Sequence, residues 1–270
     1  MLRTRVITAL IITSIGLAAV FMLPAPAFAA FAVLILLALG GWEGARLGGL
    51  DQARARAVYT AVLVITGTAV YWLHEPGQIT AWLLPGCIAW LGFLAWLARP
   101  ALGSTATKSN HAFKLLIIAL ILLTGWLAIV WLQWLSPWLV LMLLIIIASA
   151  DVGAYFSGRS IGGPKLAPSI SPGKTRSGAI GGLLAAMLVT GISAQFLPDS
   201  PFTPVTAGLL ALVLAAISIG GDLFISLLKR QRQLKDTSDL LPGHGGILDR
   251  FDSIGAAAPM FALAVAVLGQ

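Results

Sequence analysis

Nine predominantly apolar stretches follow one another along the chain, each close to the length that an α-helix needs to cross a lipid bilayer. They cover residues 6–23, 26–41, 57–73, 79–98, 113–133, 137–157, 178–197, 204–224 and 254–269. A hydrocarbon core of about 30 Å is spanned by about 20 helical residues, and within it every backbone polar group must find its partner inside the protein. The sequence therefore predicts an all-α, polytopic integral membrane protein with about nine transmembrane helices.

The composition agrees with this class of protein. Apolar residues make up 59% of the 270 residues and charged residues only 10%, whereas soluble chains are about one quarter charged. We expect one structural unit in two parts, with N-terminal transmembrane helices in 1–135 and C-terminal transmembrane helices in 136–270 that carry the two polar connections in which any chemistry should lie. Cys87 is the single cysteine and lies in an apolar stretch, so it is expected to be a small core residue.

The N-terminus imitates a cleavable signal peptide. A basic start and an apolar run precede the small-residue sequence AFA at residues 27–29, which is the pattern of such peptides. A second apolar stretch follows at once, however, and many more come after it. We therefore expect a retained first helix that turns at Pro24 and Pro26.

The positive charges indicate the orientation in the membrane. When the connections alternate between the two sides, all 17 Lys and Arg residues share one side, and the other receives His74, Glu75 and Asp199. Because Lys and Arg favour the cytoplasmic side, we predict a multi-pass protein of the cytoplasmic (inner) membrane with its N-terminus in the cytoplasm and its C-terminus outside. This placement also argues that the net charge of +7 does not serve to bind nucleic acid.

The first unusual polar segment runs from residue 149 to residue 182. Asp151 lies at the end of an apolar stretch, where an ionisable group is a functional candidate, although a carboxylate that only reaches headgroup water is an equal alternative. Further on, SPGKT places Lys174 between the hydroxyls of Ser171 and Thr175, just before the next helix. Backbone N–H groups at a helix start suit a phosphate, so we predict a phosphate-binding segment, with a plain solvated loop as the alternative. It is not a P-loop, because Pro168 stands where the first glycine would be.

The second polar segment begins on a helix that leaves the membrane. Asp222 and Ser226 are four residues apart and Lys229 and Arg230 follow one turn later, so all of them can share one helical face. A helix end whose basic side chains reach the membrane surface explains the two cations. It does not explain Asp222.

The segment that follows alternates acids with bases, and prolines and glycines interrupt it. Asp249 and Asp252 are three apart, which aligns them if a helix starts near Ile247. His244 fits a general acid or base, a phosphate hydrogen-bond donor or a plain loop residue. Convergent carboxylates suit Mg²⁺, which binds one or two of them together with phosphate oxygens. Acids for Mg²⁺ and bases for phosphate, on one side of a membrane, predict phosphoryl or nucleotidyl transfer to a lipid.

The stretch SLLKRQRQLKDTSDLLPGHGGILDRFD resembles the signature of the phosphatidate cytidylyltransferases, also called CDP-diacylglycerol synthases. The residues that match are Ser226, Lys229, Arg230, Lys235, Asp236, Pro242, His244, Gly245, Gly246, Asp249, Arg250 and Asp252. The likeness extends upstream to GDLF at residues 221–224 and to DVGAYFSGRSIGGPKLAPSISPGKT, and so covers about the C-terminal half.

The resemblance implies a Mg²⁺-dependent reaction in which CTP and phosphatidate give CDP-diacylglycerol and pyrophosphate. It also implies an all-helical, commonly dimeric fold with a paired metal centre at Asp222 and Asp249. The identity of the second metal is left open, and a monovalent cation such as K⁺ is one choice. We assign catalytic roles to Asp222, Lys229, Arg230, His244, Asp249 and Arg250. We assign substrate binding to Asp151, Ser171, Lys174, Thr175, Ser226, Lys235, Asp236 and Asp252.

The chain also departs from the family pattern. Ile225 stands where Glu is usual after GDLF, and Arg176 and Ser177 stand where Trp-Glu is usual after SPGKT. Two rival functions remain, a CTP-dependent lipid kinase and a transporter of an anionic solute. A transporter is expected to carry charges near the middle of the bilayer and an internal repeat, whereas the polar residues here crowd one side.

Overall fold

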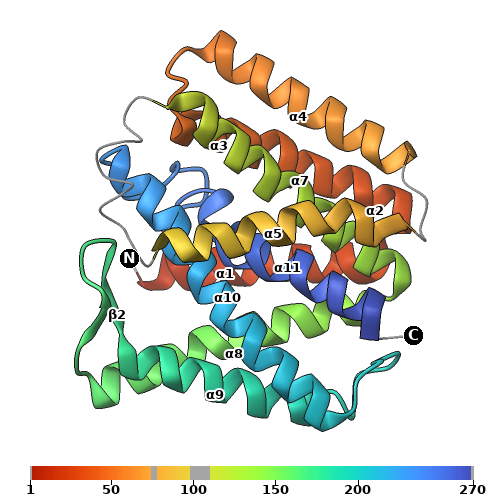
Figure 1. Ribbon diagram of the computed structural model, residues 1–270, viewed down its shortest axis with the longest axis vertical. Helices are drawn as coiled ribbons and strands as arrows, with labels where there is room; N and C mark the ends of the chain where they lie inside the picture. Colours follow the sequence, from red (N-terminus) through yellow and green to blue (C-terminus); the bar gives the residue numbers. More distant parts are fainter. Residues whose placement is uncertain (1, 74–77, 98–109, 269–270) are drawn as a thin grey trace.

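Apolar helices make up most of the computed structural model, which describes residues 2–73, 78–97 and 110–268 (Figure 1). The helices are α1 (Leu2–Met22), α4 (Ala53–Leu73), α5 (Ile79–Leu97), α7 (His111–Leu135), α8 (Pro137–Ile161), α9 (Arg176–Ser193), α10 (Pro204–Gln231) and α11 (Leu248–Leu268). Between α1 and α4, an uninterrupted helical segment consists of α2 (Ala25–Ala32), the π-helix η1 (Val33–Leu39) and α3 (Gly40–Gly48).

Each of the nine expected membrane segments is matched by a helix. Within the described ranges, eight helical segments are long and apolar enough to cross a membrane, with Ala25–Gly48 counted as one. The apolar part of α1, Val6–Met22, is shorter. The prediction of an all-α, polytopic membrane protein is thus confirmed. Its orientation stays a prediction, and four of the residues that bear on it, His74, Glu75, Arg99 and Lys108, lie outside the described residues.

Small residues let two of the helices approach closely. Gly153, Ala154 and Gly158 of α8 face Gly178, Gly181 and Gly182 of α9. A Cβ added at Gly182 would lie only 2.6 Å from the carbonyl oxygen of Ala150. Since apolar side chains gain little by leaving lipid for one another, close backbone packing of this kind is a principal source of helix association in membranes.

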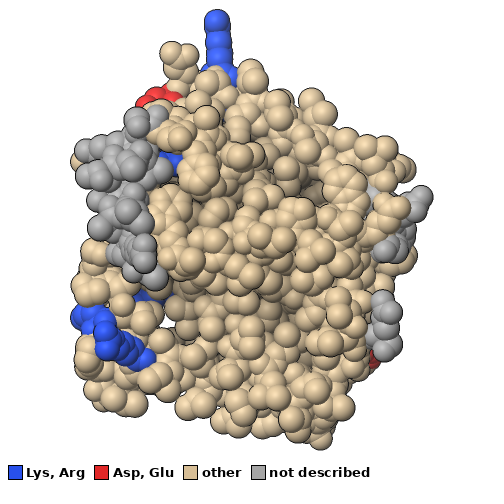
Figure 2. Space-filling view, in the orientation of Figure 1, with Lys and Arg blue, Asp and Glu red and all other residues tan. Residues whose placement is uncertain are grey.

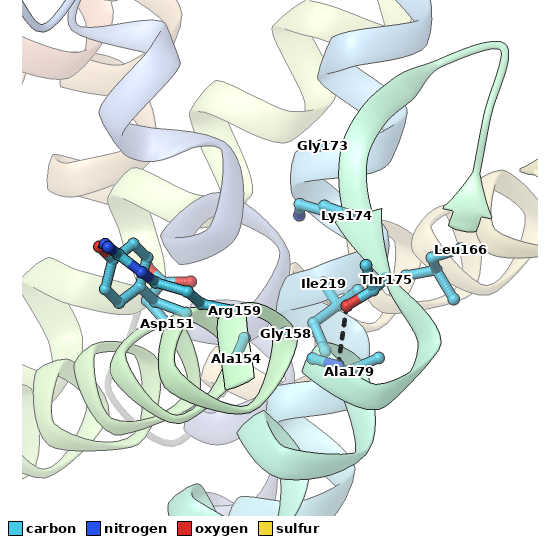
Figure 3. A pocket seen from close by; sticks show the side chains of 12 residues that line it. Asp151, Ala154, Gly158, Arg159, Leu166, Gly173, Lys174, Thr175, Ala179 and Ile219 are labelled. Atoms are coloured by element: carbon cyan, nitrogen blue, oxygen red, sulfur yellow. Dashed lines mark hydrogen bonds between the residues drawn. The ribbon is translucent and has the colours of Figure 1, made fainter. Parts of the chain in front are cut away.

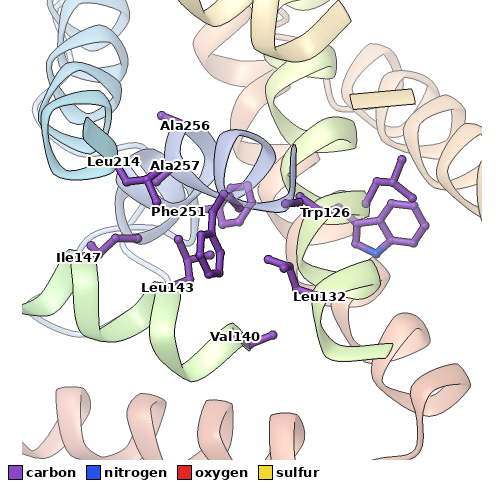
Figure 4. Close-up of a cluster of buried hydrophobic side chains, with 14 of the residues drawn as sticks. Trp126, Leu132, Val140, Leu143, Ile147, Leu214, Phe251, Ala256 and Ala257 are labelled. Carbon is purple, nitrogen blue, oxygen red and sulfur yellow. The ribbon is translucent and has the colours of Figure 1, made fainter. Parts of the chain in front are cut away.

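The core lies where α7, α8, α10 and α11 meet (Figure 4). Trp126 of α7, Leu143 of α8 and Phe261 of α11 are fully buried, and they belong to one continuous cluster that includes residues from both halves of the chain. Cys87 is buried in the same cluster, in agreement with its expected core role. The outer surface differs, because large apolar side chains such as Leu10, Trp72 and Leu188 are exposed on it. Figure 2 shows a face that is almost wholly uncharged, with Lys and Arg only along its top and left edges.

The one sheet among the described residues is a short hairpin between α8 and α9. Strand β1 (Lys165–Ala167) pairs antiparallel with β2 (Ser171–Thr175). Ile170 at its tip packs on Leu223 and Leu227 of α10, and Arg230 Nε of α10 donates to the Ile170 carbonyl at 3.2 Å. The segment is therefore a hairpin fixed to α10, and not the plain solvated loop that was the alternative to a phosphate-binding segment.

The chain has a polar end, which we define by the hairpin, the 232–247 loop and the turn between α3 and α4. Contacts join these segments: Arg232 Nη2 lies 2.6 Å from Asp51 Oδ1, and Arg46 Nη1 donates to the Thr237 carbonyl at 3.4 Å. At the opposite end, Ser136 between α7 and α8 donates to Asp199 between α9 and α10 at 3.0 Å. Helix α1 begins at the polar end and α11 ends at the opposite one (Figure 1).

Candidate active site

The hairpin and α10 are joined by an ion pair at the polar end. Lys174 of β2 pairs with Asp222 Oδ2, and Ser226, one turn further along α10, donates to Asp222 Oδ1 at 3.2 Å. Both members of the pair are partly exposed, with side chains 29% and 31% accessible. The predicted face of α10 therefore exists for Asp222 and Ser226, and their charged partner comes from the SPGKT segment.

A cavity of about 410 Å³ lies between α8, the hairpin and the start of α9. Figure 3 shows Asp151, Ala154 and Arg159 of α8 on one side of it, and Leu166, Lys174 and Thr175 of the hairpin on the other. Its wall is mostly apolar. Thr175 caps α9 by accepting from Gly178 N at 3.1 Å, so its hydroxyl shapes the helix start that SPGKT predicted.

Asp249 is held by four hydrogen bonds on α11. Its Oδ1 accepts from Lys229 Nζ at 2.7 Å. Its Oδ2 accepts from Thr237 N at 2.8 Å, from Thr237 Oγ1 at 2.9 Å and from Gly246 N at 3.0 Å. Asp249 and Lys229 are both buried. The four hydrogen bonds fix the Asp249 carboxylate to α10 and to the 232–247 loop.

Lys229 and Arg230 have different partners although they are adjacent. Lys229 binds Asp249, whereas Arg230 extends outward, where its Nη1 donates to the Leu234 carbonyl at 3.3 Å and its Nε to the hairpin. Arg230 therefore ties the hairpin and the 232–247 loop to the end of α10. Sequence spacing grouped the two cations, but the structure separates their contacts.

A second cavity, of about 450 Å³, is lined by the 232–247 loop and by Arg250 of α11. Its lining is mostly polar and includes four residues predicted from the sequence, Lys235, Asp236, His244 and Arg250. Arg250 also interacts electrostatically with Asp151, which lines the first cavity, and with Asp252.

The remaining predicted residues differ in their placement. Asp252 is buried on α11, where its Oδ1 accepts from Ser253 N at 2.7 Å, and its charge interacts with that of Asp222. Ser171 begins β2 opposite Ala167 and lines neither cavity. The structure thus places most of the predicted residues in the two cavities or in the ion pairs beside them. Ser226, Arg230 and Asp252 adjoin these positions through hydrogen bonds or charge, and Ser171 lies outside both cavities.

Glu43 on α3 is a polar residue of this site that the sequence analysis missed. It is only 3% exposed, and its carboxylate accepts hydrogen bonds from the 232–247 loop and from the start of α11. The signal was present, because Glu43 is a carboxylate at the end of an apolar stretch, which is the same argument that selected Asp151.

The departures from the family pattern lie outside the two cavities. Ile225 is fully buried in the apolar core. Arg176 is exposed at the start of α9, and Ser177 donates to the Gly162 carbonyl and so fixes the end of α8. None of the three lines either cavity.

Asp222 and Asp249 offer carboxylate oxygens, the type of ligand that a hard cation takes. In the described part of the chain no three His, Cys, Asp or Glu side chains converge as a ready metal cage. Asp222 accepts one bond or ion pair on each oxygen, and Asp249 Oδ1 accepts one. A carboxylate oxygen has two lone pairs, so both residues keep an acceptor site for Mg²⁺, which needs only one or two carboxylates beside phosphate oxygens.

Comparisons with known proteins match nearly the whole chain. A model of the cytidylyltransferase family matches residues 3–268. The chain is 38% identical to the phosphatidate cytidylyltransferase of Pseudomonas aeruginosa, over 97% of this chain and 96% of that protein. It is 34% identical to that of Haemophilus influenzae, over 97% of both, and 36% identical to that of Brucella suis, over 100% of this chain and 95% of that protein. The likeness read from the C-terminal half thus extends to the N-terminal helices.

Proposed function

The chain belongs to the cytidylyltransferase family, and from this premise we propose that it converts CTP and phosphatidate into CDP-diacylglycerol and pyrophosphate. The observation that carries this proposal is the presence, at one end of an apolar bundle, of a mostly apolar cavity lined by Lys174 and a polar cavity lined by Arg250. The two substrates differ in the same respect, because phosphatidate has long apolar chains next to its phosphate, whereas CTP is polar throughout.

The reaction needs little activation of the nucleophile. A phosphate oxygen of phosphatidate, already anionic, forms a bond to the α-phosphorus of CTP, while the bond from that phosphorus to the bridging oxygen breaks. Pyrophosphate leaves with the electron pair. The main barrier is electrostatic, because two polyanions must meet, and fixed positive groups that hold both reactants lower it.

The cations of the site supply this positive charge. We assign Lys174 to the lipid phosphate, because it lines the mostly apolar cavity. Lys235 and Arg250 line the polar cavity and are assigned to the triphosphate. Lys229 and Arg230 lie beside these positions, bound to Asp249 and to the hairpin. Lys174 and Lys229 are each paired with a carboxylate. A substrate phosphate would therefore compete with the carboxylate for the lysine, and a metal would compete with the lysine for the carboxylate.

Other residues orient the reactants. We propose that Asp151, Asp236, Asp252 and Ser226 position ligands or the basic side chains, and that Thr175 and Ser171 shape the phosphate-binding hairpin. His244 lines the polar cavity and is proposed to donate a hydrogen bond to a phosphate oxygen. The acyl chains must stay in lipid, so we expect the first cavity to open sideways to the membrane beside the exposed Tyr155.

Asp222 and Asp249 are the residues that would hold Mg²⁺. The ion would supply positive charge to phosphate oxygens. A second, monovalent cation such as K⁺ would be held near the same acids. Asp151 and Asp252 are near enough to Asp222 to interact with it electrostatically. We propose further that the polar end faces the cytoplasm in the inner membrane, where CTP is available, and that the protein forms a homodimer.

The identity of the products tests this function. The purified protein in detergent is incubated with labelled CTP, phosphatidate and Mg²⁺, and we expect a lipid that carries CMP together with pyrophosphate. Formation of CDP and a phosphorylated lipid would instead identify a CTP-dependent lipid kinase. Absence of any CTP-derived product, together with uptake of an anion by vesicles that contain the protein, would identify a transporter.

A further inference from the structure

Glu43 receives hydrogen bonds from four donors that lie about 200 residues further along the chain. Its Oε1 accepts from Ser238 Oγ at 2.6 Å and from Ile247 N at 3.0 Å. Its Oε2 accepts from Thr237 Oγ1 at 3.0 Å and from Leu248 N at 2.8 Å. One buried carboxylate on α3 thus binds both the 232–247 loop and the first residue of α11.

The donors explain why a carboxylate is stable at this buried position. Ile247 N and Leu248 N belong to the start of α11, where backbone N–H groups have no partner inside the helix and the helix dipole favours negative charge. Glu43 therefore caps α11 from a different membrane segment. A buried carboxylate is costly without such partners, and these donors stabilise it.

Thr237 connects Glu43 to Asp249. Its single hydroxyl lies 3.0 Å from Glu43 Oε2 and 2.9 Å from Asp249 Oδ2, so one proton serves two carboxylates. Its backbone N–H also donates to Asp249, while Arg46, one turn after Glu43, donates to its carbonyl. The position of the Asp249 carboxylate therefore depends on α3 through Thr237.

The Gly-Gly sequence of the loop leaves room for these contacts. Gly245 has a φ of +79°, and a Cβ added to it would lie 2.6 Å from Asp249 Oδ2. A Cβ at Gly246 would collide with Glu43 and with the Thr237 hydroxyl. The backbone of the loop thus passes directly between the two carboxylates, which no side chain at these positions would permit.

We propose that Glu43 is a positioning residue for the transfer reaction. Through Thr237 and the start of α11, it fixes Asp249 at the angle that the transition state requires, without touching substrate itself. The proposal rests on the function proposed above. It predicts that loosening Glu43 lowers kcat more than it changes either KM, because Asp249 stays in the site but loses its alignment.

Substitutions at two residues, Glu43 and Thr237, test the two ends of this connection. In Glu43→Gln the amide NH₂ must face one of the two backbone N–H donors, so that bond is lost. In Thr237→Val the shape is kept and only the hydroxyl is removed, whereas Thr237→Ser keeps the hydroxyl. We expect a fall in kcat of roughly 10- to 100-fold for Glu43→Gln and Thr237→Val, within the range for supporting residues, and near wild-type kcat for Thr237→Ser.

The control is Gln133→Leu, which removes another buried polar side chain. Gln133 Nε2 donates to the carbonyls of Val20 and Leu23 near the opposite end of the bundle. We expect this variant to lower the melting temperature but not kcat. A purely structural role for Glu43 would give the same pattern for Glu43→Gln and would overturn the proposal.

A double-mutant cycle and proteolysis complete the test. Glu43→Gln and Thr237→Val together should lower kcat by less than the product of their separate effects, because both break one connection. Trypsin should cut after Arg232 or Lys235 faster in Glu43→Gln than in the wild type. Independent effects on kcat, or equal cleavage rates, would contradict the proposal. If the wild type made no CMP-bearing lipid, the proposed function would fail, while the cleavage rates would still report on the Glu43 contacts.

Discussion

Lys229 on α10 and Asp249 on α11 form a buried ion pair with 2.7 Å between Nζ and Oδ1. Their side chains are 10% and 3% exposed, whereas the Lys174 and Asp222 side chains are 29% and 31% exposed. The site therefore contains one inner pair, which holds two membrane helices together, and one outer pair at the wall of a cavity. The two should respond differently to substitution.

Replacing Lys229 should destabilise the protein. Lys229→Met leaves the Asp249 carboxylate buried without its cation, and breaking a buried pair from one side costs about 3–5 kcal/mol. Unfolding of the detergent-solubilised protein, followed by tryptophan fluorescence, measures the loss. Adding Asp249→Asn should restore part of it, because the uncompensated charge is then removed. A Lys229→Met variant as stable as the wild type would contradict the inner role of this pair.

Replacing Lys174 should affect activity more than stability. A partly exposed pair contributes about 0–1 kcal/mol, so Lys174→Met should unfold close to the wild type. Its CTP-dependent rate should fall by roughly 100-fold, the loss typical of one electrostatic donor. The matched control is Asp51→Asn, which removes the ion pair with Arg232 outside both cavities and should keep the rate. Equal rates for the two variants would exclude Lys174 from the site.

The α8–α9 interface should not tolerate a larger residue. In Gly182→Ala the new Cβ lies 2.6 Å from the Ala150 carbonyl, so the helices must separate, at about 1–3 kcal/mol. Gly92→Ala on α5 is the control, because nothing lies within 4 Å of its added Cβ. We expect a lower melting temperature for the first variant only. If both variants melted alike, close packing would not hold these helices together.

The orientation can be measured with a reporter at the C-terminus. An enzyme fused after Gln270 that is active only outside the cytoplasm should be active, because an odd number of membrane segments follows a cytoplasmic N-terminus. A second fusion in the 232–247 loop should be inactive. A cytoplasmic C-terminus would show that either the orientation or the odd number of segments is wrong.

The membrane helices could be predicted because the bilayer fixes their length and composition. The apolar stretches do not show the polar ends of the helices: α10 continues beyond residue 224 to Gln231, and α11 begins at Leu248, ahead of residue 254. These added turns carry Lys229 and Asp249, whose charges hydropathy counts against a membrane segment. Helical spacing did suggest both extensions, since Asp222 was aligned with Lys229 and a helix start was expected near Ile247.

The site could be predicted where its residues are close in sequence or share the signature. The Lys174–Asp222 pair and the four bonds of Asp249 depend on how separate segments pack, which spacing does not reveal. The partners of Glu43 at residues 237–248 could not be predicted for the same reason, although its place at the end of an apolar stretch marked Glu43 as a candidate. Ser171 was selected for its place in SPGKT, but it lines neither cavity.

The fate of the phosphates of CTP tests the central claim most directly. CTP labelled with ³²P at the α position, and separately at the γ position, is incubated with the purified protein, phosphatidate and Mg²⁺. Attack at the α-phosphorus predicts that the α label enters the lipid and that the γ label appears in pyrophosphate. Recovery of the γ label in the lipid, with the α label left in CDP, would contradict the account.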